Sequence, residues 1–409
     1  MSARRLGHGG HVDRARPLRF TWDGRTLQGL AGDTLASALM AAGVRVVGRS
    51  FKHHRPRGIM SAGVEEGGAI VTLGAGARRI ANVRATTVEL REGLSASGQN
   101  AWPSVRFDLG RVNDLLSRFI GAGFYYKTFF GLSGSGTWEW MQFEKLIRRA
   151  AGMGSAAREA DPDRYEIVHD HCDVLVVGAG PAGLSAARAA ADAGLDVILA
   201  EQDFALGGDL LGAAGPVGDA DAEAWRRAAI PADVRVWLRA TVFGLYDHGV
   251  AGVVERVHDG LSPSALPRER LRIVRARRIV LGVGALERPF AFGGNDRPGV
   301  MGAAAARTYA ARFGVLAGRR IVVATAHDGA YADAALLSRS GAQVTLADAR
   351  RDPDPALRAA ALAAGVEVLP GFVPVETYGA GAVRGVWLGR HLGGGWARPE
   401  RDAAADVVA

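Results

Sequence analysis

Three glycines, Gly178, Gly180 and Gly183, stand in a GxGxxG pattern and have the clearest chemical potential in the chain. They follow residues 172–177, a near-continuous apolar run that predicts a buried parallel strand. In such a turn the first glycine permits a sharp bend, the second leaves room for a pyrophosphate, and the third lets the next helix pack closely. The N-terminus of that helix presents amide hydrogens and a partial positive charge to the diphosphate. The pattern therefore predicts a dinucleotide-binding turn.

An acidic residue closes the second strand of the same unit. We expect a helix over 181–193 and a strand over 195–200, with Glu201 at its end. A carboxylate there accepts hydrogen bonds from a ribose and repels the 2′-phosphate of NADP. NAD and FAD both carry this ribose, so these residues leave open which of the two binds. An unoccupied turn of the same shape is the competing interpretation.

Two later segments should approach the same cofactor. Gly207 and Gly208 form a second glycine pair, and residues 278–285 predict a strand that ends in small residues, although a plain buried strand and turn would look alike. No catalytic or metal-ligating residue can be assigned. The expected cofactor-binding residues are Gly178, Ala179, Gly180, Pro181, Ala182, Gly183, Glu201, Gln202, Gly207, Gly208 and Gly284.

A second βαβ unit is predicted at about 318–350, and its strand ends at Asp348. Its equivalents of the three glycines are Thr325, His327 and Ala330. None of the three positions is a glycine, so side chains occupy the space that a pyrophosphate would need. We expect one dinucleotide per chain.

The N-terminal residues predict a small α+β domain. Asp23-Gly24 is a hairpin turn dipeptide between two alternating segments, and Asp33 is placed as an N-cap. This order is typical of ferredoxin-like (β-grasp) folds. The expected elements are strands 18–22 and 25–30, a helix over 34–42, and strands 68–73 and 84–90.

Two segments leave their roles open. Residues 48–58 are densely basic and form either a loop that grips a phosphate or an acidic partner, or a plain exposed loop. Residues 102–154 are rich in aromatic side chains, which suit packing against another domain or subunit but equally suit a core. Residues 156–164 are polar and predict a linker.

Together these elements predict an α/β protein. It would combine an FAD/NAD(P)-binding, Rossmann-like two-dinucleotide fold with the small N-terminal domain. The expected divisions are a ferredoxin-like domain at 1–100, an aromatic-rich connector at 101–170, and an FAD/NAD(P)-binding domain at 171–409 that contains the second unit.

Composition excludes several classes of protein. With 48% hydrophobic and 22% charged residues, the 409-residue chain is globular rather than disordered. The net charge is +8, but the cations are nearly all arginines and scattered, so no nucleic-acid partner is expected. The single cysteine, Cys172, permits no internal disulfide and no cysteine-built metal cluster. Such cysteine usage fits a reducing cytoplasm, and since no apolar run is long enough to span a membrane, no membrane partner is expected.

Five stretches of the chain carry a family resemblance: 32–39, 48–63, 124–128, 171–173 leading into the glycine motif, and 295–301. They resemble the N-terminal part of the alpha subunit of heterotetrameric sarcosine oxidases. The resemblance implies a complex with beta, gamma and delta subunits that oxidises sarcosine to glycine and forms hydrogen peroxide. It also implies that the alpha subunit holds NAD as a ligand without a redox role, while FAD and FMN belong chiefly to the beta subunit.

Two departures from the family bear on function. The N-terminal module resembles a [2Fe-2S] ferredoxin domain, yet it contains no cluster cysteine. The folate domain of the family is also absent, and residues 404–409 read as the opening of a strand that returns to the first βαβ half. We therefore expect a fragment of a longer chain. The alternatives are an FAD-binding subunit of an amine or opine dehydrogenase complex, and a structural module with a vacant site.

Overall fold

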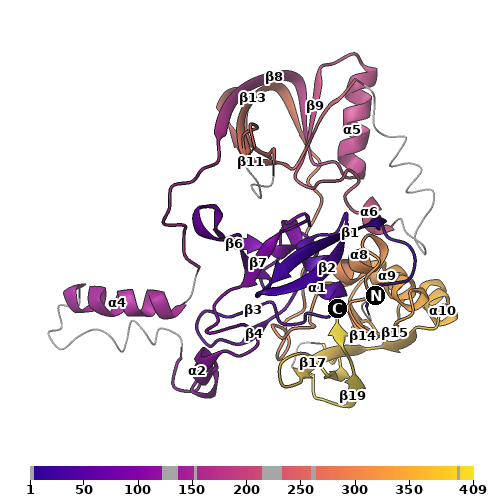
Figure 1. The fold of residues 1–409 in the computed structure, drawn as a ribbon. Helices are drawn as coiled ribbons and strands as arrows, with labels where there is room; N and C mark the ends of the chain where they lie inside the picture. Colours follow the sequence, from indigo (N-terminus) through magenta and orange to yellow (C-terminus); the bar gives the residue numbers. More distant parts are fainter. Residues whose placement is uncertain (1–3, 122–136, 152–153, 214–232, 259–263, 394–396) are drawn as a thin grey trace.

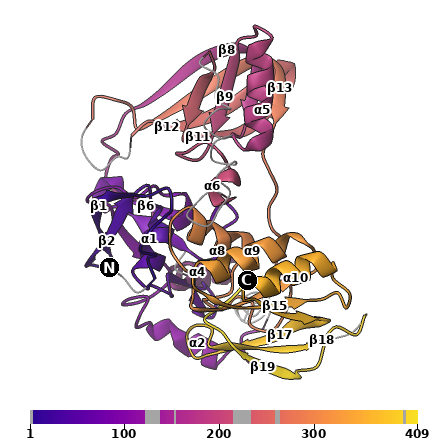
Figure 2. The same cartoon turned by 90° about the vertical axis from the view of Figure 1, so that its right-hand side faces the viewer.

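The computed structural model describes residues 4–121, 137–151, 154–213, 233–258, 264–393 and 397–409. Three lobes are visible in Figures 1 and 2: the N-terminal domain, a first α/β unit at the top, and a second α/β unit below it. The aromatic residues expected at 124–130 lie outside the described part of the chain.

The N-terminal domain is a five-stranded sheet in the order β2-β1-β7-β5-β6, covered by one helix. Asp23 and Gly24 both adopt positive φ, as the predicted two-residue hairpin turn requires. The sheet and its helix comprise β1 (Asp13–Trp22), β2 (Arg25–Ala31), α1 (Leu35–Ala41), β5 (Ile70–Leu73), β6 (Ile80–Arg84) and β7 (Ser95–Gly98).

Two details of this domain differ from the sequence prediction. The N-cap of α1 is Thr34, whose hydroxyl accepts a hydrogen bond from the Ser37 amide, because Asp33 instead binds the guanidinium of Arg5. The strand expected at 84–90 is wrong: β6 ends at Arg84, and the 3-10 turn η2 (Ala85–Thr87) follows it. The β-propensity of 84–90 was therefore overridden by tertiary contacts.

Further elements lie in loops of the N-terminal domain or connect this domain to the first α/β unit. Most of them contain fewer than five residues, whereas α4 is a full helix that extends away from the body of the molecule (Figure 1). They are β3 (Gly48–Arg49), β4 (Pro56–Arg57), η1 (Gly76–Arg78), η3 (Leu109–Arg111), α2 (Val112–Leu115) and α4 (Thr137–Ala151).

The first α/β unit carries the glycine motif on a six-stranded sheet in the order β10-β9-β8-β13-β12-β11. Strand β8 begins at Tyr165, before the expected position, because residues 165–171 pair in parallel with β13. Strand β13 ends at Leu281, so the small residues after it form the turn. The elements are β8 (Tyr165–Val177), α5 (Pro181–Asp192), β9 (Val197–Glu201), α6 (Leu210–Ala213), β10 (Arg235–Leu238), β11 (Ala240–Tyr246), η4 (Asp247–Gly249), β12 (Val250–Arg256) and β13 (Glu269–Leu281).

The second α/β unit has a parallel sheet in the order β16-β15-β14-β20 and an antiparallel sheet in the order β17-β18-β19. The predicted helix and strands of the second βαβ unit are all present. The elements are α8 (Ala303–Ala311), β14 (Arg320–Thr325), α9 (Gly329–Arg339), β15 (Gln343–Asp348), α10 (Pro355–Ala363), β16 (Glu367–Pro370), β17 (Phe372–Tyr378), β18 (Gly385–Arg390), β19 (Arg401–Ala404) and β20 (Val407–Val408).

The expectation that the C-terminal residues return to the first unit is wrong. Strand β20 pairs in parallel with β14, with Val407 opposite Ile321. Both valines of β20 are buried in the second unit, one on each face of the sheet. The apolar run correctly predicted a buried strand. The strand with which it pairs depends on the path of the chain through β17 to β19, which ends beside β14.

One hydrophobic core joins the N-terminal domain to the second α/β unit. It runs from Phe20 and Leu39 through Tyr309 and Phe313 of the α8 region to Ile321 of β14. The Tyr309 hydroxyl donates a hydrogen bond to the Ser61 carbonyl, 2.7 Å away. The first α/β unit has two cores of its own, one on each face of its sheet. The N-terminal domain and the second α/β unit therefore pack as one body.

In the part of the chain described here, no helix combines the length and apolar character that crossing a membrane would demand.

Candidate dinucleotide-binding site

The glycine turn lies at the carboxyl edge of the first sheet, between β8 and α5. Gly178 has φ +91°, and a Cβ atom there would lie 2.5 Å from the Gly282 carbonyl oxygen. A Cβ atom on Gly183 would overlap the carbonyl oxygen of Gly178. These two glycines are therefore required by the packing of the turn itself.

Gly180 differs from the other two glycines. A Cβ atom built on it would meet no atom within 4 Å, so the space in front of it is open. Gly180 caps the N-terminus of α5, and the next two residues, Pro181 and Ala182, are exposed. An open space at a helix N-terminus fits a diphosphate, whose charge the helix dipole favours.

Glu201 lies directly behind this turn. Its Oε2 accepts a hydrogen bond of 2.6 Å from the amide of Ala179, and its Oε1 accepts one of 2.8 Å from the amide of Asp203. The carboxylate is buried, and burial raises its pKa, although the bonds from the two amides act in the opposite direction. Glu201 thus holds the glycine turn in place, and each oxygen keeps a second lone pair for a ribose hydroxyl.

The second glycine pair reaches the turn as expected. Gly207 (φ +128°) donates its amide hydrogen to the Ala179 carbonyl at 2.8 Å, and a Cβ atom on Gly208 would lie 2.9 Å from the Gly180 Cα. Gln202 is exposed, and its carbonyl accepts a hydrogen bond from Arg256. The fold therefore brings the residues of 178–183, 201–202 and 207–208 together.

The segment after β13 borders the same edge. Leu281 pairs in register with Val177, and Gly284 (φ +71°) follows three residues later. Leu281, Val283 and Leu286 are exposed by 58%, 68% and 66%. Large apolar side chains left open beside a glycine turn are suited to cover a ring system or a partner surface.

Sequence reasoning missed the ion pairs that hold the strand end. Asp203 forms a two-bond ion pair with Arg312, at 2.6 and 2.8 Å. Arg256 donates to the carbonyls of Gln202 and Thr87. These contacts span up to 169 residues of sequence, so no local signal could have revealed them.

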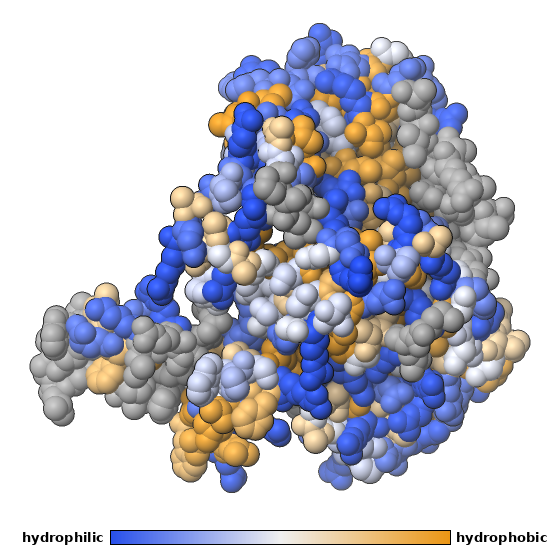
Figure 3. Space-filling view, in the orientation of Figure 1, coloured by the Kyte–Doolittle hydropathy of each residue, from blue (hydrophilic) through white to orange (hydrophobic). Residues whose placement is uncertain are grey.

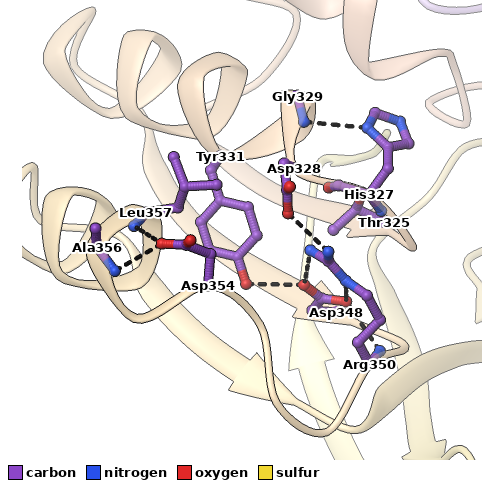
Figure 4. A network of polar contacts seen from close by, with 10 residues as sticks. All are labelled: Thr325, His327, Asp328, Gly329, Tyr331, Asp348, Arg350, Asp354, Ala356 and Leu357. Atoms are coloured by element: carbon purple, nitrogen blue, oxygen red, sulfur yellow. Dashed lines mark hydrogen bonds and ion pairs between the residues drawn. The ribbon is translucent and has the colours of Figure 1, made fainter.

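In the second α/β unit, side chains of the chain itself bind the acidic residue that corresponds to Glu201 (Figure 4). Asp348, the equivalent of Glu201, accepts hydrogen bonds from the Tyr331 hydroxyl at 2.8 Å and from Arg350 at 2.8 and 3.1 Å. Arg350 also binds Asp328 at 2.7 Å, and the Nδ1 atom of His327 accepts from the Gly329 amide. The carboxylate that would hold a ribose is thus already paired.

The basic segment 48–58 forms the β3-β4 hairpin and uses its cations inside the chain. These groups bind carbonyls and carboxylates of neighbouring segments. The structure therefore favours a structural role for this hairpin over a phosphate-binding loop. The contacts are Arg49 with the Val105 carbonyl, Lys52 with the Gly121 carbonyl, Arg55 with Asp114, and Arg57 with Asp296.

The N-terminal domain does not fit an iron-sulfur cluster. Its sequence contains no cysteine, and Cys172 is buried in β8 of the first α/β unit, where burial raises its pKa to about 11. The described residues hold no group of three or more His, Cys, Asp or Glu side chains that could bind a metal ion. His54 Nδ1 instead lies 2.7 Å from Asp108 in a buried pair.

Two family models match separate parts of the chain. A model of the 2Fe-2S iron-sulfur cluster binding domain matches residues 15–101, and one of FAD dependent oxidoreductases matches residues 173–270. Among solved structures, L-proline dehydrogenase from P. horikoshii superimposes with a TM-score of 0.62 at 16% identity, over all of this chain and 61% of that one. These matches confirm the predicted fold class.

Curated relatives are much closer in sequence. The chain is 51% identical over 84% of its length to the sarcosine oxidase subunit alpha of Rhizobium meliloti (strain 1021), and 40% identical over 90% to that of Corynebacterium sp. (strain P-1). It spans about a third of the length of these relatives, 35% and 34% respectively.

Proposed function

This chain is a homologue of the sarcosine oxidase alpha subunits, and from that premise we propose that it is the NAD-binding alpha subunit of a sarcosine oxidase complex. The complex would oxidise the C–N bond of sarcosine with dioxygen and water, giving glycine, formaldehyde and hydrogen peroxide. The beta, gamma and delta subunits are the proposed partners, with the redox flavins FAD and FMN chiefly in the beta subunit. The cytoplasm is the proposed location.

The open space in front of Gly180 supports this role most directly. It lies at the N-terminus of α5, and the buried carboxylate of Glu201 binds the amide of the adjacent Ala179. These residues would hold the diphosphate and the adenosine ribose of a dinucleotide, respectively. The proposed cofactor-binding residues are the set expected from the sequence: residues 178–183, Glu201, Gln202, Gly207, Gly208 and Gly284.

The alternative is an FAD-binding subunit of an amine or opine dehydrogenase complex. The match of residues 173–270 to the FAD dependent oxidoreductases favours it, because the same turn and carboxylate serve the ribose of FAD. Such a dehydrogenase needs a route by which electrons leave the flavin. The cysteine-free N-terminal domain offers no cluster ligands for that route, and this supports the NAD proposal.

The nucleotide itself decides between the two proposals. The purified chain would be denatured, and the released compound identified by absorbance and mass. Colourless protein that releases about one NAD per chain is the expected result. Yellow protein that releases FAD would replace the proposal with the dehydrogenase alternative, and release of no nucleotide would favour a structural module.

A further inference from the structure

An apolar surface is exposed on the segment that follows the N-terminal sheet. We call it the 102–119 surface. Figure 3 shows it as the orange cluster at the lower left, at the position of α2. Its members are large apolar side chains with exposures between 46% and 78%: Trp102, Phe107, Leu109, Val112, Leu115, Leu116 and Phe119.

Polar contacts on the inner side hold this segment in place. The buried carboxylate of Asp108 accepts hydrogen bonds from the amides of Trp102 and Gly110 and contacts His54. The guanidinium of Arg49 binds the Val105 carbonyl, and Arg55 binds Asp114. These bonds hold the backbone of the segment in a defined conformation. The exposed apolar side chains therefore have fixed positions on the surface.

The charges beside the surface are positive. Arg106, Arg111 and Arg118 are exposed, and none has an ion-pair partner within the residues that the structure describes. The nearby acids are not available, since Asp108 is buried and Asp114 is paired with Arg55. A complementary surface therefore has an apolar centre and carboxylates at its border.

A second element points to the same conclusion. Helix α4 extends away from the rest of the molecule (Figure 1), and its Met141 and Phe143 are exposed by 48% and 38%. A helix of this length depends on tertiary packing for most of its stability. Its exposed Met141 adds apolar area that a partner could cover.

We propose that the 102–119 surface, with α4 beside it, docks a partner subunit whose contacting face is apolar at its centre and acidic at its border. This inference rests on the proposed function for the existence of partner subunits. A second copy of this chain fits less well, because a two-fold interface would bring Arg106, Arg111 and Arg118 of both copies together.

The test is co-expression of the chain with the beta subunit of the same complex. Leu115→Ser with Phe119→Ser should weaken binding of the beta subunit at least tenfold, and Arg111→Glu with Arg118→Glu should do the same. Raising the salt concentration should weaken the wild-type complex and strengthen the charge-reversed one, because salt screens an attraction in the first and a repulsion in the second. The control is Leu362→Ser with Leu392→Ser, which removes comparably exposed side chains of the second unit and should bind normally.

Each other outcome overturns the docking inference. These outcomes are unchanged binding by both surface variants, no binding by the wild-type chain, or a dimer of the chain that the Leu115 and Phe119 changes abolish. Thermal unfolding of each variant checks that the fold is retained. The nucleotide content of the same preparations distinguishes failure of the docking inference from failure of the proposed function. If the chain holds NAD but the surface variants bind the beta subunit normally, only the docking inference fails.

Discussion

At the scale of single residues, the three glycines of the motif have different physical duties. Gly178 and Gly183 are confined by backbone atoms of the turn, whereas Gly180 faces open space. The distinction follows from position: the first and third glycines contact the strand and the turn, and the second faces outward. Substitutions can therefore separate binding from folding.

Gly180→Val should abolish nucleotide retention while lowering the free energy of unfolding by no more than about 1 kcal/mol, because valine is a poorer N-cap than glycine. Its Cβ atom would meet no atom within 4 Å, and its methyl groups would occupy the space proposed for the diphosphate. Gly183→Ala is the matched control, because its methyl group overlaps the Gly178 carbonyl and should cost about 1–3 kcal/mol of stability. Bound nucleotide and urea unfolding of both variants check the prediction, and a Gly180→Val chain with full nucleotide would show that the site is misplaced.

Glu201 should make nucleotide binding depend on pH. Its pKa is raised by burial, so it takes up a proton at a higher pH than an ordinary carboxyl group and then loses acceptor capacity. Affinity should start to fall at a higher pH than the titration of an ordinary carboxyl group would cause, whereas Glu201→Gln should bind about tenfold more weakly at pH 7 and show little pH dependence. Protonation of a carboxyl group whose pKa is raised in the folded state stabilises the fold. Unfolding caused by protonation of Glu201 therefore cannot account for the loss of affinity. Titration calorimetry across this range is the measurement, and parallel curves for the two proteins would contradict it.

At the scale of elements, two βαβ units with the same topology have different interiors. In the first, the carboxylate at the end of β9 accepts two backbone amides and keeps acceptor capacity. In the second, the carboxylate at the end of β15 is bound by Tyr331 and Arg350, as Figure 4 shows. The difference lies in side chains rather than in the path of the backbone.

Asp348→Asn should lower the free energy of unfolding by about 2 kcal/mol at neutral pH, because it leaves Arg350 without its buried partner. Tyr331→Phe, which removes one hydrogen bond, should cost about 1 kcal/mol. Despite burial, bonds from Arg350 lower the pKa of Asp348, so its stabilisation is present above the ordinary carboxyl pKa and is lost as pH falls through the lowered value. Urea unfolding at pH 7 and at successively lower pH should show the deficit at neutral pH and its decrease only below the ordinary carboxyl pKa. Nucleotide content should stay unchanged, and a loss of nucleotide would place the site in the second unit.

At the scale of the whole molecule, ion pairs join the first α/β unit to the N-terminal domain. Arg239 forms two hydrogen bonds with Glu89, at 2.7 and 2.9 Å, and Arg256 binds the Thr87 carbonyl. Arg312 links Asp203 to the α8 region. The strand end that carries Glu201 is therefore fixed by residues of both neighbouring lobes.

Replacement of Arg239 and Glu89 by alanine, singly and together, should reveal a coupling free energy of about 0.5–3 kcal/mol. The pair is partly exposed, so the value should lie in the lower half of that range. Urea unfolding of the three variants and the wild type completes the cycle. The exposed pair of Arg188 and Asp192 within α5 provides the control cycle, for which little coupling is expected. Additive effects at Arg239 and Glu89 would show that the pair does not hold the lobes together.

The sequence by itself determined the local features of this protein. The apolar run before Gly178, the turn at Asp23-Gly24 and the acid at 201 are set by short-range periodicity and backbone conformation, which act within a few residues. The tertiary structure alone decided the features that depend on distant partners. These are the pairing of β20 with β14, the shared core of two lobes, and the internal pairing of Asp348 and of the basic hairpin. Such contacts depend on where the fold delivers each segment, and that is a property of the whole packed chain rather than of any window of its sequence.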